Sequence, residues 1–304
     1  MGASKLRGIF LFLICIVSQP LFADQLQQFP LIRDSYDEHM QLLLDRTLSQ
    51  LKLNVAVEQK RLSVALVDIT DVHNPRLSHV NGDEMMYAAS LPKIGILFAA
   101  LYDIQAGKLN FSDRLQKAMV NMIRYSSNID ATFVMNMVGK YRVNKILASE
   151  PFRLYDENTN GGLWVGKEYG KNPAFQRDPL HNISHGATAI QVARLYYLLE
   201  TGQLLSPRFT RMMKEFLSKP GINHKFVKGL AGRNAEVFRK SGTWRDWHAD
   251  SAIVKNDVKQ YIIVALAKDK KGGDWLTNLS TTIYDVMIPQ KMAGIIIGNQ
   301  QKNR

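Results

Sequence analysis

The chain has 304 residues, of which 46% are hydrophobic and 22% are charged, and its formal net charge is +12. This composition is that of a globular protein, so it excludes wholesale disorder, collagen-like repeats and coiled-coil arrays. The single cysteine, Cys15, excludes a disulfide framework and a cysteine-based zinc site. The basic residues are scattered without the interleaved aromatic residues of a nucleic-acid groove, so we expect no nucleic-acid partner.

Residues 1–23 have the pattern of a secretory signal peptide. A basic start precedes an apolar run over residues 8–17, and Pro20 stands before a small residue, Ala23. The run is short for a membrane span. An uncleaved anchor is the alternative, because Leu21 rather than a small residue occupies position −3 of the expected cut. We expect a secreted or periplasmic monomer without a stable membrane anchor.

The mature chain, residues 24–304, is predicted to form one domain. Hydrophobic periodicity predicts its elements in chain order: a helix over residues 34–52, strands over 61–69 and 76–80, helices over 94–105, 128–138 and 188–201, strands over 235–240, 250–254 and 260–267, and a helix over 274–287. Residues 156–187 are expected to form a long loop. This order predicts an α/β (α+β) fold, in which an antiparallel sheet of about five strands from both chain ends is flanked by helices, with an all-helical subdomain.

Ser90 and Lys93 form a Ser-x-x-Lys element in which the amine can take the hydroxyl proton. Residues three apart on a helix lie on one face, and a nucleophile at a helix N-terminus gains from the positive end of the helix dipole. Pro92 is tolerated in a first helical turn. Ser49 and Lys52 have the same spacing, but they lie within a predicted helix with no strand before it. We therefore interpret Ser90 as the nucleophile.

Two further motifs contain polar residues at the start of a helix and at the end of a strand. Ser126 and Asn128 form a Ser-x-Asn element, whose hydroxyl can relay a proton and whose amide can hold a carbonyl group. Helix capping is the alternative for this element. Lys240, Ser241 and Gly242 end a predicted strand, where the glycine allows a substrate to approach closely. A hairpin turn is the alternative for this second element.

The three motifs, in this order, resemble those of the penicillin-binding protein and serine β-lactamase superfamily, and most closely those of class A β-lactamases. The resemblance covers about residues 61–287 and implies a β-lactamase/transpeptidase-like fold. The usual class A Asp between the Ser and the Asn is replaced by Ser127, which is closer to the penicillin-binding pattern. The short stretch from Ser90 to Ser126 implies a trimmed helical subdomain.

The resemblance implies acyl transfer on a small-molecule β-lactam or a D-alanyl peptide, without a cofactor. Ser90 would attack the carbonyl, Lys93 would take its proton, and Ser126 would pass the proton to the leaving nitrogen. Backbone N–H groups of Ser90 and Thr243 would form the oxyanion hole. The substrate would be held by Asn128, Lys240, Ser241 and Thr243. The expected activity is that of a β-lactamase; the alternatives are a D-alanyl-D-alanine carboxypeptidase and a catalytically inactive sensor of cell wall or antibiotic.

Glu168 and Asn172 have the Glu-x-x-x-Asn spacing of the class A loop that holds the deacylating water. The resemblance therefore implies that Glu168 is the deacylating base and that Asn172 contributes to binding. The alternative is a solvent-facing glutamate beside Lys167 and Lys171, and Glu157 is a weaker candidate for the same role.

Arg245 and a pair of histidines complete the candidate residues. Arg245 could bind a substrate carboxylate, although residues 244–248 could equally form a hairpin tip. His181 and His185 are four residues apart, but no glutamate stands between them and no cysteine is available, so we expect no metal site.

Overall fold

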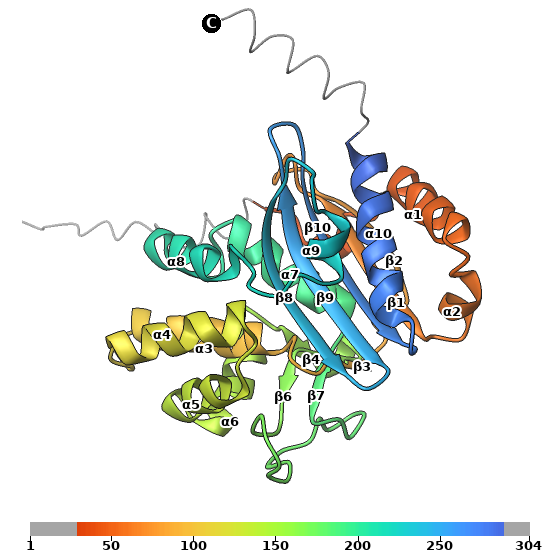
Figure 1. Ribbon diagram of the computed structural model, residues 1–304. Helices are drawn as coiled ribbons and strands as arrows, with labels where there is room; N and C mark the ends of the chain where they lie inside the picture. The colour runs from red at the N-terminus through yellow and green to blue at the C-terminus, as the bar shows by residue number, and fades with distance from the viewer. Residues whose placement is uncertain (1–28, 289–304) are drawn as a thin grey trace, which may run out of the picture.

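The computed structural model describes residues 29–288 (Figure 1). The predicted signal peptide and Cys15 lie outside these residues. The N-terminal elements are η1 (Ile32–Asp34), α1 (Glu38–Gln50), α2 (Asn54–Glu58), β1 (Leu62–Asp68), β2 (Arg76–Val80) and β3 (Met86–Tyr87). The middle contains α3 (Lys93–Gln105), α4 (Asp113–Arg124), α5 (Asn128–Val138), α6 (Lys140–Leu147), β4 (Tyr155–Asp156), η2 (Glu157–Thr159), β5 (Gly161–Gly162), β6 (Trp164–Val165), β7 (His185–Ala187), α7 (Ala189–Glu200) and α8 (Pro207–Leu217). The C-terminal part contains α9 (Phe226–Gly229), β8 (Glu236–Trp244), β9 (Trp247–Lys255), β10 (Gln260–Lys268) and α10 (Gly272–Met287).

The main sheet has five antiparallel strands in the order β2-β1-β10-β9-β8. Its first two strands come from the N-terminal part and the other three from the C-terminal part, and they meet where β1 pairs with β10. The predicted sheet of about five strands from both chain ends is therefore confirmed. Strand β8 is left at the edge, with one side available for a neighbour.

Both faces of this sheet are covered by helices (Figure 1). Along β1, Val64 and Leu66 pack into the core with α1 and α10, whereas Ala65 and Val67 pack into the core with α7 and α3. Successive side chains of a strand point to opposite faces, so a strand that is covered on both faces is mainly apolar. All seven residues of β1 are accordingly buried.

The middle of the chain is mainly helical, as predicted, but it has more elements than the periodicity indicated. Helix α4 was not predicted, although its buried residues Leu115, Met119 and Met122 follow helical spacing and Ser112 caps its first turn. The long loop expected over residues 156–187 is interrupted by short elements, and its longest segment outside helices and strands is residues 166–184. The expected loop contains β5, β6 and β7, and β7 joins β3 and β6 in a small sheet. These strands have only two or three residues, too few to show an alternating pattern.

The Lys240 motif lies within β8 and not at its end, which corrects the predicted strand boundary. The strand continues through Gly242 to Trp244, which pairs with Trp247 on β9. Arg245 and Asp246 form the turn between the two strands, so residues 244–248 do form a hairpin tip.

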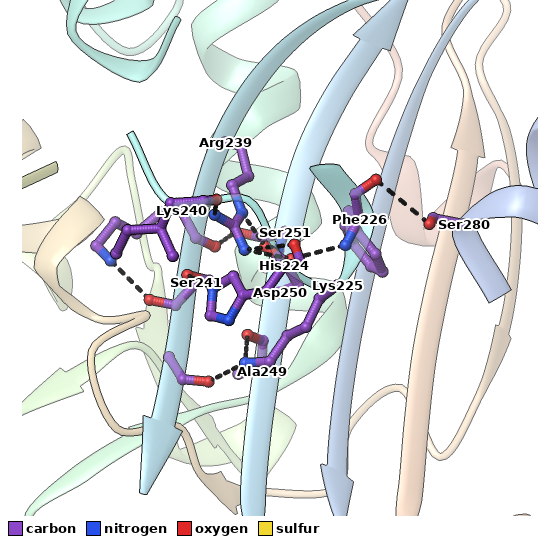
Figure 2. A network of polar contacts seen from close by, with 12 residues as sticks. His224, Lys225, Phe226, Arg239, Lys240, Ser241, Ala249, Asp250, Ser251 and Ser280 are labelled. Atoms are coloured by element: carbon purple, nitrogen blue, oxygen red, sulfur yellow. Dashed lines mark hydrogen bonds and ion pairs between the residues drawn. The ribbon is translucent and has the colours of Figure 1, made fainter. Parts of the chain in front are cut away.

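A buried ion pair joins β8 to β9 (Figure 2). Arg239 donates to both carboxylate oxygens of Asp250 at 2.7 and 2.8 Å, and the two side chains are 3% and 0% exposed. The Asp250 carboxylate also accepts from the Phe226 amide at 3.1 Å, and Arg239 donates to the carbonyl groups of Ile222 and His224. The pair therefore fixes residues 222–226 beside the motif strand.

We expect Arg239→Met to lower the free energy of unfolding by about 3–5 kcal/mol, because the Asp250 charge would remain buried without a partner. Urea denaturation followed by circular dichroism measures this change. The double variant Arg239→Met/Asp250→Leu should recover most of the loss. Lys255→Met, at the exposed end of β9, is the control and should change stability by less than about 0.5 kcal/mol. An equal effect of Arg239→Met and Lys255→Met would contradict the prediction.

Candidate active site

Ser90 lies on the turn between β3 and α3. The preceding residue, Ala89, has φ 51°, a left-handed conformation that is unfavourable for a residue with a β-carbon. Leu91 and Lys93 donate backbone hydrogen bonds to Ala88 and Ser90, which tightens the turn before the helix begins. The Ser90 hydroxyl has no hydrogen-bond partner within residues 29–288 and lines a cleft of about 670 Å³.

Gly242 allows β8 to lie directly against this turn. A β-carbon at residue 242 would come within 2.8 Å of the Ser90 amide nitrogen and 2.1 Å of the Ala88 carbonyl oxygen. Any side chain here would therefore push the strand away from the nucleophile. The glycine thus keeps the backbone of β8 against the Ser90 turn, a role that the sequence analysis did not assign to it.

Lys93 is fully buried, and its amine points at the Ser-x-Asn element. It donates to the Ser126 carbonyl at 2.6 Å and to Asn128 Oδ1 at 2.7 Å, and it lies 3.5 Å from Ser126 Oγ. Burial lowers the pKa of Lys93 to about 7, because the charged form is poorly solvated. The amine is thus able to accept a proton near neutral pH.

Ser126 stands between the two lysines of the motifs. Its Oγ accepts from Lys240 Nζ at 3.1 Å, and Lys93 Nζ approaches it from the other side. Ser126 has φ 58°, a left-handed backbone that aims the side chain into the site and not along α5. The neighbouring Ser127 caps α5 by accepting from the Asp130 amide at 3.2 Å. Capping and the contact with the lysines thus fall on two different serines.

Lys240 is buried beside Lys93, and two cations so close together disfavour each other's charge. Burial, and then repulsion from Lys93 and Arg239, lower the pKa of Lys240 well below its ordinary value. Lys240 also donates to the Ser241 carbonyl at 2.6 Å. A negative charge bound beside the two amines would favour their charged forms.

The hydroxyls of Ser241 and Thr243 are held by two residues that the sequence analysis did not single out (Figure 2). His224 Nε2 lies 3.2 Å from Ser241 Oγ, and burial lowers the pKa of His224 to about 4, so the ring is neutral. Lys225 donates to Thr243 Oγ1 at 2.7 Å, to the Ala249 carbonyl at 3.1 Å and to the Gly242 carbonyl. No sequence motif predicts the positions of His224 and Lys225, because these positions depend on the Arg239–Asp250 ion pair.

Tyr169 covers Lys93 on the loop side of the site. The Lys93 amine lies 4.4 Å from the centre of the Tyr169 ring, and His185 stacks on the other face of that ring at 4.3 Å. Burial lowers the pKa of His185 to about 3, so this ring is neutral. The loop residue that contacts the Lys93 amine is thus an aromatic ring, a contact that the sequence analysis did not predict.

Glu168 lines the same cleft as Ser90, but its carboxylate has other partners. It accepts from Asn172 at 2.5 Å and pairs with Lys140 at 2.5 Å. The contacts with Lys140 and Asn172 lower the pKa of Glu168. Within residues 29–288, no hydrogen bond or ion pair joins Glu168 to Ser90 or Lys93.

The remaining sequence candidates lie at the margin of the cleft or outside it. The Arg245 guanidinium lies 5.7 Å from the centre of the Trp244 ring at the exposed hairpin tip. Glu157 is exposed on η2. Neither residue lines the cleft, whose walls include Tyr87, Asn128, Thr243, Trp244 and Trp247.

The described part of the chain offers neither a metal cluster nor a membrane span. Among residues 29–288, no group of three or more His, Asp, Glu or Cys side chains is placed to bind a metal ion. Within the same residues, no helix has the length and apolarity needed to cross a bilayer.

Several solved structures share the fold of this chain at low sequence identity. A β-lactamase from Sphaerobacter thermophilus is 17% identical, with a TM-score of 0.64, and the match covers 80% of this chain and 98% of that one. PBP-A is 16% identical with a TM-score of 0.61, over 81% and 95% of the two chains. A variant of the class A β-lactamase of the last common ancestor of Gram-negative bacteria is 18% identical with a TM-score of 0.62, over 81% and 98%. No curated protein sequence matches the chain.

The predicted β-lactamase-like fold is thus confirmed. Residues 114–287, more than half of the chain, match the family model described as the beta-lactamase enzyme family. The matched segment contains Ser126, Asn128 and the whole Lys240 motif, whereas Ser90 and Lys93 precede it and are brought to them by the fold. The chain belongs to the β-lactamase enzyme family.

Proposed function

We propose that the protein is an exported serine hydrolase that opens β-lactams through an acyl-enzyme on Ser90. The observation that carries this proposal is the placement of one hydroxyl, Ser126 Oγ, between the buried amines of Lys93 and Lys240, with the half-buried Ser90 one helical turn before Lys93 and lining the cleft. This arrangement provides a base, a proton relay and a positive potential around one nucleophile.

In the first step, Ser90 Oγ attacks the lactam carbonyl carbon while neutral Lys93 takes the hydroxyl proton. The developing oxyanion is stabilised by the backbone N–H groups of Ser90 and Thr243, which Gly242 allows to lie close together. The tetrahedral intermediate then collapses, and the C–N bond breaks. The proton on Lys93 passes through Ser126 Oγ to the leaving nitrogen.

The substrate carboxylate is bound on the other side of the reacting carbonyl. Lys225 donates to the Thr243 oxygen, so the Thr243 hydrogen is directed away from Lys225 and is available to a ligand. Ser241 provides a second hydroxyl, and Lys240 provides the charge. Asn128 holds the amide of the acyl side chain while its Oδ1 keeps Lys93 in place.

Release of the acyl group requires a water molecule and a base. Glu168 is the cleft carboxylate that would take the proton of this water, with Asn172 orienting it. Its lowered pKa makes it a weak base while it is paired with Lys140. We therefore expect deacylation to be slower than acylation.

A D-alanyl-D-alanine carboxypeptidase is the second candidate, and Tyr169 favours it. The ring of Tyr169, rather than a carboxylate, lies against Lys93. An enzyme of this kind would form a long-lived adduct with penicillin; a mutant of PBP-A has been solved as its acyl-enzyme with penicillin G. The two candidates differ only in the fate of the acyl-enzyme.

We expect Ser90→Ala to abolish the covalent adduct with benzylpenicillin, because it removes the attacking oxygen. Intact mass spectrometry of the mature protein measures the adduct. The matched control is Ser49→Ala, which alters the exposed serine of the other Ser-x-x-Lys sequence and should be acylated normally. An adduct on the Ser90→Ala protein would show that the nucleophile lies elsewhere.

The acylation rate should rise with pH through about 7, where Lys93 loses its proton. Below this pH the amine is charged and cannot act as a base, so the rate should fall about tenfold per pH unit. Stopped-flow acylation by a chromogenic cephalosporin measures the profile. Lys93→Arg keeps a charge that is not lost, and should lower the rate by about 10²–10⁴-fold at every pH. A flat profile from about pH 5 to about pH 9 would contradict Lys93 as the base.

Glu168→Gln should leave acylation unchanged and slow deacylation by about 10²–10⁴-fold, because the water loses its base. A burst of product without turnover and a stable mass adduct would report this effect. Glu157→Gln is the control and should behave as wild type. Turnover by Glu168→Gln at the wild-type rate would exclude the deacylating role. A wild-type protein that itself remains acylated would favour the carboxypeptidase.

A further inference from the structure

A second cavity of about 750 Å³ adjoins the active-site cleft beyond the end of β8. Its walls come from residues 59–61, 84–86 and 268–271, together with Asp246 and Trp247 of the hairpin. Trp247 lines both this cavity and the cleft that contains Ser90. On the wall formed by β3, Met86 belongs to the second cavity and its neighbour Tyr87 to the cleft. The two spaces are therefore neighbours, with Trp247 as a wall of both.

This cavity has an excess of positive charge. Two of its basic residues are already paired, Lys60 with Glu84 at 3.0 Å and Arg61 with Asp269 at 2.5 Å. Three exposed lysines remain, for which no ion pair exists within residues 29–288: Lys268, Lys270 and Lys271. The remaining acid in the wall is Asp246, so the unpaired side chains have a net charge of about +2. We call this space the lysine pocket.

The Trp247 ring contacts one side chain of the lysine pocket and one side chain of the cleft that contains Ser90. The Lys268 ammonium lies 5.0 Å from the centre of the Trp247 ring, and Tyr87 contacts the same ring edge-on at 6.0 Å. A chain that leaves the cleft would thus pass over an aromatic surface and reach a group of ammonium ions. An aliphatic chain ending in a carboxylate matches this sequence of surfaces.

The order of residues along β8 shows which part of the substrate points this way. The carboxylate subsite is at Lys240 and Ser241, and the strand then runs through Thr243 to Trp244 and turns back at Trp247. Three residues of strand span about 10 Å. The acyl side chain lies across the reacting carbonyl from the carboxylate, so it extends along β8 toward Trp247 and the lysine pocket.

We propose that the lysine pocket binds a second carboxylate, located on the acyl side chain of the substrate. The preferred acyl donors are then dianionic, with one carboxylate at Lys240 and Ser241 and the other at Lys268, Lys270 and Lys271. This inference rests on the proposed acylation of Ser90 and deepens it by naming the substrate class.

Two penicillins that differ in one charge test this inference. They are 6-aminopenicillanic acid N-acylated with glutaric acid and the side-chain methyl ester of the same compound. The second-order rate of Ser90 acylation, followed by quenched-flow intact mass spectrometry, should be about 5- to 20-fold higher for the free acid. About 0.5 M NaCl should reduce this preference, because it screens exposed charges.

The triple variant Lys268→Gln/Lys270→Gln/Lys271→Gln should lose the preference and retain the wild-type rate with the methyl ester. The matched control changes three exposed lysines of the helical region, Lys108→Gln/Lys117→Gln/Lys145→Gln, and should keep the preference. Equal wild-type rates for the two penicillins, or a preference that survives in the first triple variant, would overturn the inference while acylation of Ser90 stands. No acylation by either penicillin would overturn the proposed function and this inference with it.

Discussion

The close approach of β8 to the turn before α3 is the constraint on which the site depends. It exists because residue 242 has no side chain to separate the strand from the Ser90 amide. The same approach brings Lys240, on the sheet, to Ser126, between two helices. Without it the β8 backbone would separate from the Ser90 turn, and the two lysines would no longer approach the same hydroxyl. One glycine therefore couples the sheet to the helical part of the molecule.

The approach of β8 to the turn before α3 brings several basic side chains together in a buried site. The surrounding structure determines which of them has an acidic partner. Arg239 is neutralised by Asp250, which leaves Lys93, Lys240 and Lys225 facing hydroxyl and carbonyl groups. Such groups solvate an amine without neutralising it, so burial lowers the pKa of all three lysines. A site of this kind favours an anion as ligand and a neutral amine as base, and both properties have the same origin.

Those parts of the fold and of the site that depend on local residue patterns could be predicted from the sequence. The sheet from both chain ends follows from the order of the apolar segments, and the four-residue spacing of Glu168 and Asn172 indicated that the two side chains lie close together. Long-range contacts carried no such signal. Tyr169 reaches Lys93 through a loop whose course depends on three small strands, and His224 and Lys225 are positioned by an ion pair between other elements. Glu168 has the expected neighbour in sequence, yet its pairing with Lys140 could not be read from spacing.

Because the sheet is built from both chain ends, its position in the sequence also determines when the site can assemble during synthesis. Ser90 and Lys240 are separated by 150 residues, and β1, which pairs with β2 on one side, obtains its second partner only when β10 has been made. Strand pairings between such distant segments form slowly, because closing a long loop costs conformational entropy before any stabilising contact forms. A nascent chain that ends before β8 contains Ser90, Lys93 and Ser126 but neither Lys240 nor the strand that packs against the Ser90 turn. The complete arrangement around Ser90 therefore exists only after the last strands of the protein have been made.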